Sequence, residues 1–148
     1  MRVYLPMQKS ELVSFFQNRS FTAPVLIGPT LKVAQEYGVS ELEEIEYAAL
    51  EIARTRSESE KLHIITAHEL PESLLTQASE IEAGNLAGSF TLDWQDLVAI
   101  YRITSSDEEL DQNLIKHMIL NSILSIKKRF GNDYGNIVIC CDNKNFWR

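Results

Sequence analysis

The segment 107–127 carries more apolar side chains than a single buried helix face can hold. Its leucine, isoleucine and methionine residues recur at helical spacing, and Leu120 and Leu124 widen the stripe further. The rest of the stripe is Leu110, Leu114, Ile115, Met118, Ile119, Ile123 and Ile126. Such a helix either lies at the centre of the domain or gives part of its surface to a second subunit. The pattern therefore predicts a homodimer.

The remaining chain alternates short β-type runs with helical patterns. Strands are predicted over 3–6, 24–28, 61–68, 86–92, 97–103 and 137–141, and helices over 9–18, 30–37, 41–56, 71–77 and 107–127. Pro6 should end the first strand, because proline has no N–H to donate. Thr30 can cap the second helix, and Ser40 with Glu43 matches a capping box for the third.

These elements predict one α+β domain. A chain of 148 residues can bury a self-sufficient core without a metal or a disulfide. We expect a mixed or mostly antiparallel sheet of about five strands, packed by the helices near 41–56 and 107–127.

Charge and cysteine usage narrow the function classes. The net charge of -7 has the wrong sign for a protein that mainly binds nucleic acid, although 114–148 carries 6 basic and 2 acidic residues. Cys140 and Cys141 are adjacent, which suits neither a disulfide framework nor a zinc site, so we expect reduced thiols and a cytoplasmic protein. No apolar run is long enough to predict a membrane-spanning helix.

Few residues suggest chemistry. The three histidines have no metal-ligand spacing, and no glycine-rich phosphate loop or serine elbow occurs, so neither a metal nor a cofactor is predicted. His68 and Glu69 form the best acid–base candidate, because they end a predicted strand and strand ends border crevices. A half-buried histidine satisfied by a backbone group is the alternative, and it is the commoner role of a lone histidine.

The carboxyl-terminal segment combines basic and aromatic residues. Lys127, Lys128 and Arg129 could contact phosphates of a single-stranded nucleic acid, or could simply complement a helix C-terminus. Phe146 and Trp147 could pack on the sheet or insert into a partner subunit.

Two segments resemble a family of uncharacterised small actinobacterial proteins that has no assigned function. They are the starting run MRVYLP and the run LEEIEYAAL at 42–50. The resemblance implies a strand followed by helices, with a later strand at 63–67. It carries over no catalytic residues, so Glu46 and Tyr47 are candidates by position alone, and we expect Tyr47 to pack in the core.

The leading functional hypothesis is thus a non-enzymatic protein-interaction module that self-associates. A small enzyme or ligand-binding domain with a crevice near His68 and Glu69 is the first alternative. Weak single-stranded nucleic-acid binding through 127–148 is the second. The expected partner is a second copy of this chain, with an unidentified protein as the alternative, and no membrane is expected to be involved.

Overall fold

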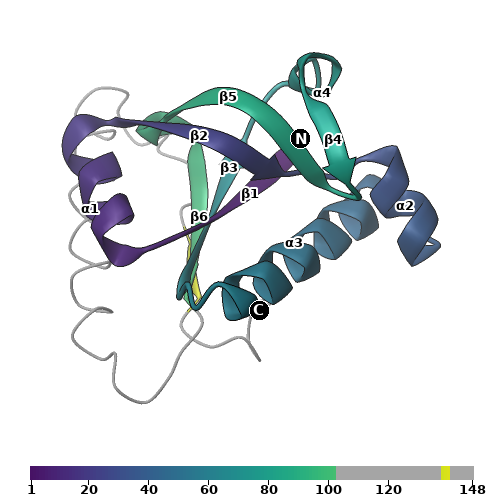
Figure 1. The fold of residues 1–148 in the computed structure, drawn as a ribbon, viewed down its shortest axis with the longest axis horizontal. Helices are drawn as coiled ribbons and strands as arrows, with labels where there is room; N and C mark the ends of the chain where they lie inside the picture. Colours follow the sequence, from purple (N-terminus) through teal and green to yellow (C-terminus); the bar gives the residue numbers. More distant parts are fainter. Residues whose placement is uncertain (103–137, 141–148) are drawn as a thin grey trace.

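The structure is a computed structural model, and it describes residues 1–102 and 138–140 (Figure 1). The predicted helix over 107–127 lies outside the described residues. The described residues form seven strands, four α-helices and one 3-10 turn. They are β1 (Arg2–Met7), α1 (Lys9–Asn18), β2 (Ser20–Ile27), α2 (Leu31–Tyr37), α3 (Leu42–Ser59), β3 (Ile64–Glu69), α4 (Leu74–Gln77), β4 (Ser79–Glu82), β5 (Asn85–Asp93), the 3-10 turn η1 (Trp94–Asp96), β6 (Leu97–Arg102) and β7 (Val138–Cys140).

The strands form one sheet in the order β4-β5-β2-β1-β3-β6-β7. The first six strands of this order pair antiparallel, and β7 runs parallel to β6. The predicted α+β class is therefore confirmed. The sheet has more strands than expected because the short polar strand β4, with sequence SEIE, has no apolar alternation that would predict it.

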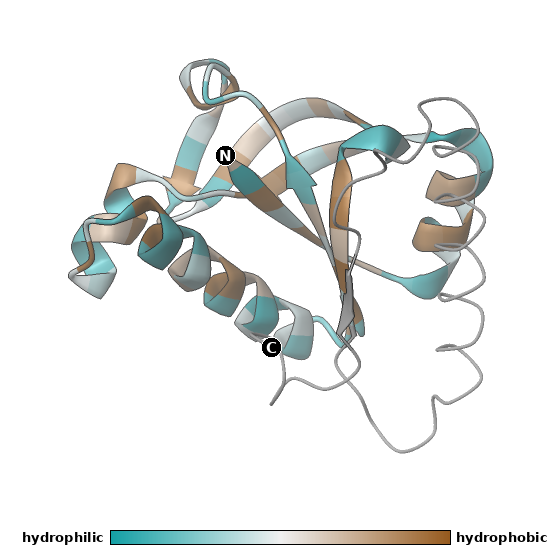
Figure 2. Ribbon diagram, turned by 180° about the vertical axis from the view of Figure 1, so that it is seen from behind, coloured by the Kyte–Doolittle hydropathy of each residue, from teal (hydrophilic) through white to brown (hydrophobic). Residues whose placement is uncertain are grey.

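Both faces of the central strands are buried. Along β1, Val3 and Leu5 pack in a core with α1, whereas Tyr4 between them packs in a second core with α3. In Figure 1 the two helices lie on opposite sides of the sheet. Figure 2 shows hydrophobic and hydrophilic residues alternating along α3, as expected for a helix with one face on the sheet.

Two local predictions are wrong. Pro6 does not end β1, because the ladder with β3 continues through Pro6 and Met7, while the pairing of β1 with β2 is confined to Tyr4. The Ser40 capping box is absent, since α3 begins at Leu42 and its N-cap residue, Glu41, makes no side-chain cap hydrogen bond. Ser40 lies one residue too early to cap the helix.

The turn that separates α2 from α3 follows the predicted pattern. The Thr30 hydroxyl accepts a hydrogen bond from the Val33 backbone N–H and so caps α2. Gly38 has a φ of 65°, the left-handed conformation that ends the helix, and the next N–H, that of Val39, bonds to the Ala34 carbonyl at 3.0 Å. This turn brings the end of α2 beside the start of α3.

Candidate functional site

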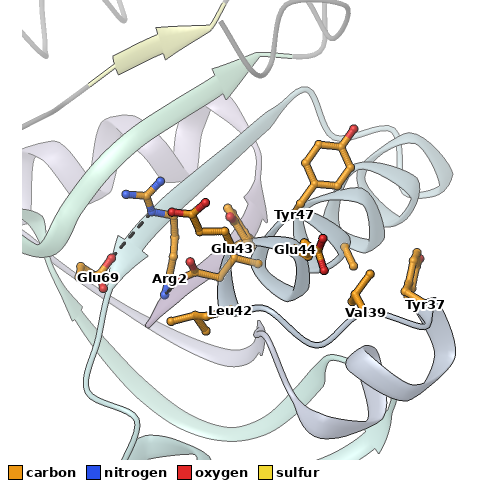
Figure 3. Close-up of a pocket in the computed structure, with 11 residues that line it drawn as sticks. Arg2, Tyr37, Val39, Leu42, Glu43, Glu44, Tyr47 and Glu69 are labelled. Atoms are coloured by element: carbon orange, nitrogen blue, oxygen red, sulfur yellow. Dashed lines mark hydrogen bonds and ion pairs between the residues drawn. The ribbon is translucent and has the colours of Figure 1, made fainter.

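A pocket of about 750 Å³ lies where the first turns of α3 face the start of β1 and the end of β3 (Figure 3). Its volume falls within the range of small-molecule sites. We call it the α3 pocket. Its lining residues are Arg2, Tyr4, Tyr37, Val39, Leu42, Glu43, Glu44, Glu46, Tyr47, Ala48 and Glu69.

The strand register places three of these side chains on the sheet face that α3 covers. Arg2 stands opposite Glu69 in the β1–β3 ladder, and Tyr4 stands opposite Ala67, which belongs to the α3-side core. Residues two apart on a strand share a face, so Arg2 and Tyr4 both face the helix. In Figure 3, Arg2 and Glu69 lie at one end of the pocket, and Tyr37 and Val39 lie at the other.

The pocket is negatively charged. Four carboxylates and one guanidinium line it. Glu46 Oε2 accepts a hydrogen bond of 2.6 Å from the Arg2 backbone N–H. Glu69 contacts the Met1 amino group at 3.1 Å and Arg2 Nε at 3.8 Å. The other two carboxylates, those of Glu43 and Glu44, are on exposed residues in the first turn of α3.

Tyr4 is the most deeply buried polar side chain of the pocket, at 1% exposure. Burial is the main cause that raises the pKa of its hydroxyl, and the charges of Glu46 and Glu69 act in the same direction. The phenol is therefore neutral at physiological pH. Its hydroxyl makes no hydrogen bond to any residue within 1–102 or 138–140, so it can donate to a ligand or accept from one.

The structure separates the predicted acid–base pair. Glu69 lines the α3 pocket, whereas His68 lies on the opposite face, fully buried, with its ring 5.7 Å from that of Phe15. His68 Nε2 lies 2.8 Å from the Thr66 hydroxyl oxygen. Burial lowers the pKa of His68 to about 3. His68 thus lies in the core, with Nε2 beside the Thr66 hydroxyl and Nδ1 without a hydrogen-bond partner among the described residues, and it does not reach the pocket.

The resemblance drew attention to two helix residues, and both line the pocket. Tyr47 is 44% exposed, so the expectation that it packs in the core is wrong. Glu46 bridges α3 to β1 through its bond to Arg2. Sequence reasoning missed Tyr4, because an aromatic residue in an apolar strand reads as core. The strand register is the signal that would have placed its hydroxyl beside α3.

The other predicted site residues lie outside the described residues. They are Leu120, Leu124, Phe146 and Trp147 for partner binding, and Lys127, Lys128 and Arg129 for nucleic-acid binding. Within the part of the chain that is described, no cluster of three or more His, Cys, Asp or Glu residues could hold a metal ion. Nor does that part contain a helix long and apolar enough to cross a membrane.

Comparisons with protein-family models, with curated proteins and with solved structures each found no match to this chain. The resemblance to the actinobacterial proteins stays a prediction.

Proposed function

We propose that this chain is a small cytoplasmic binding domain and that the α3 pocket holds its ligand. One observation carries the proposal: the Tyr4 hydroxyl lines the pocket on a side chain that is 1% exposed, and it bonds to none of the described residues. The hydroxyl is not among the fully buried polar atoms that lack a partner, so it opens onto the pocket and can bond to whatever fills it. A ligand that fills the pocket would supply the missing partner.

A second pocket of about 580 Å³ offers a useful contrast. It lies between the later turns of α3 and the β4–β5 hairpin. Three of its polar side chains pair with one another, since Arg56 bonds to Glu60 at 3.2 Å and to Asn85 at 3.1 Å. Because these partners already satisfy one another, a ligand would have to displace them, and we favour the α3 pocket.

The lining of the α3 pocket favours binding over covalent chemistry. Its described residues include no histidine, cysteine, lysine, serine or threonine, and its groups able to carry a proton are those of glutamates and tyrosines. The nearest histidine in sequence, His68, lies on the other face of the sheet. Of the two functions predicted for the region around Glu69, an enzyme or a ligand-binding domain, we therefore propose the ligand-binding domain.

A fragment screen by ligand-observed NMR tests the proposal. Saturation transfer from the protein to a mixture of small polar fragments should be strong for the wild type. It should fall in Val39→Trp, where the larger side chain fills one end of the pocket. Leu31→Trp is the matched control, because Leu31 is 73% exposed on α2 and lies outside the pocket. Equal saturation transfer in all three proteins would contradict the proposal.

Self-association is a second candidate function, with a second copy of this chain as the partner. The described residues add one observation in its favour: Leu31 and Ile81 are 73% and 71% exposed, and the Thr30–Glu80 hydrogen bond holds their two segments together. Static light scattering at micromolar concentration should report twice the monomer mass. Ile81→Lys should lower that mass, and a monomeric wild type would refute the idea.

A further inference from the structure

We infer that the ligand of the α3 pocket is an organic cation with a primary alkylammonium group. The inference rests on the proposed function and names the ligand class for that site. Three features carry it: uncompensated carboxylates at the rim, a neutral phenol at the buried end, and apolar and aromatic side chains between them.

The carboxylates divide into two groups. Glu46 and Glu69 are already engaged, by the Arg2 backbone N–H at 2.6 Å and by the Met1 amino group at 3.1 Å. Glu43 and Glu44 are exposed, and no ion pair joins either of them to the described residues. The rim therefore presents two negative charges that a cation entering the pocket would meet first.

The Tyr4 hydroxyl gives the buried end its polarity. Because burial keeps the phenol protonated, it carries no charge that would repel an anion or attract a cation. An ammonium group can donate a hydrogen bond to the phenol oxygen while its charge faces the carboxylate of Glu46. A neutral alcohol could also bond to Tyr4, but it would gain nothing from the carboxylates.

The remaining lining suits an alkyl chain. Leu42, Val39 and Ala48 are apolar, and Tyr37 and Tyr47 are both partly exposed aromatic rings. Such rings attract organic cations through their π faces as well as covering methylene groups. A carboxylate or phosphate ligand would have Arg2 as its single cationic partner among the lining residues, and four carboxylates would repel it; Arg2 Nε is buried, lies 3.8 Å from Glu69 and makes no hydrogen bond to the described residues.

A two-dimensional amide NMR titration of the full chain tests the ligand class with three probes of equal length. They are n-pentylamine, n-pentanol and n-pentanoate, each at neutral pH. Pentylamine should shift the amide signals of Tyr4 and of the first turns of α3, with a dissociation constant that is roughly millimolar for so small a ligand. Pentanol should bind at least tenfold more weakly, and pentanoate should cause no saturable shift.

Two variants locate the interaction. The double variant Glu43→Gln, Glu44→Gln should weaken pentylamine binding about fivefold, because it removes both rim charges. Tyr4→Phe should weaken pentylamine binding without changing the order of affinity of the three probes. Glu36→Gln is the matched control, since Glu36 is an exposed glutamate of α2 that does not line the pocket. It should leave the affinity unchanged.

The outcomes separate this inference from the proposed function. If pentanol binds as tightly as pentylamine, or if the double glutamine variant binds pentylamine as the wild type does, the inference is overturned while a ligand pocket remains. If neither the probes nor the fragment mixture shifts the pocket signals, both are overturned. If pentylamine binds, the ammonium group of the ligand can come from a free amine or from a protein side chain. Comparison of 1,5-diaminopentane with a lysine-containing tripeptide distinguishes these sources. Tighter binding of the diamine assigns a free amine, and tighter binding of the peptide assigns a protein side chain.

Discussion

The buried imidazole of His68 should make the native state sensitive to acid. The Thr66 hydroxyl donates its hydrogen to the Leu5 carbonyl at 3.2 Å, so it can only accept from His68 Nε2, which therefore carries the proton in the neutral ring. A second proton must go to Nδ1, which is buried and has no hydrogen-bond partner among the described residues. Protonation is thus opposed by burial alone.

The sign and the size of the effect follow from the two pKa values. The pKa of His68 is about 3 in the native state and 6.5 in the unfolded chain, so below pH 6.5 the unfolded chain binds a proton that the native state does not. The stabilisation is therefore complete above pH 6.5 and is lost as the pH falls toward 3. Between pH 7.0 and pH 4.5 the free energy of unfolding should drop by about 2.5 kcal/mol from this group.

Urea unfolding at pH 7.0 and pH 4.5 measures the drop, and His68→Gln isolates the part that belongs to His68. Glutamine places an amide N–H near the position of Nε2 but does not titrate. The drop should be about 2.5 kcal/mol smaller in this variant than in the wild type. Equal drops in wild type and His68→Gln would refute the reasoning.

Three further outcomes are expected. Gly84→Ala should destabilise the fold by roughly 2 kcal/mol, which is more than Gly38→Ala should. Both glycines have a positive φ, but a Cβ at Gly84 would meet Val33 Cγ2 at 3.0 Å, whereas a Cβ at Gly38 would meet nothing within 4 Å. Thermal melting measures the difference, and equal shifts of the melting temperature would contradict the prediction. Thr30→Ala should lower the free energy of unfolding, measured in urea, by about 1–2 kcal/mol, and Thr30→Ser should lower it much less. The reason is that the Thr30 hydroxyl caps α2 and bonds to Glu80. Equal losses in the two variants would argue against the cap. Pentylamine affinity should fall several-fold when the salt is raised from 20 to 300 mM, and NMR titrations that show no change would speak against rim charges.

Much of the fold could be predicted from local pattern. The helix over 9–18 carries its apolar residues at helical spacing, and α1 spans those residues. Thr30 and Gly38 mark the two ends of α2. Both ends could be predicted because a capping hydroxyl and a left-handed backbone conformation each depend on the type of a single residue. The Ser40–Glu43 spacing failed for the opposite reason: the start of α3 depends on where the turn after Gly38 returns the chain to the sheet, which is a tertiary effect.

The candidate site could be predicted only in part, because it depends on pairing between distant segments. Glu69 was singled out since it ends a strand, and it does line the pocket. Its neighbour His68 was singled out for the same reason, but adjacent residues on a strand face opposite ways. Tyr4 joins Glu69 only through the β1–β3 register, which a single sequence does not reveal.

Most polar groups of the α3 pocket have a structural role that needs no ligand. Glu43 and Glu44 complement the helix dipole at the start of α3, and Glu46 satisfies the backbone N–H of Arg2. The Tyr4 hydroxyl has no such role among the described residues. If the hydroxyl made a hydrogen bond within the fold, Tyr4→Phe should lower the free energy of unfolding, as the loss of a buried hydrogen bond does. If it serves a ligand, the same change should leave that energy within about 0.5 kcal/mol of the wild type and weaken pentylamine binding, and this pairing of results is what the pocket geometry requires.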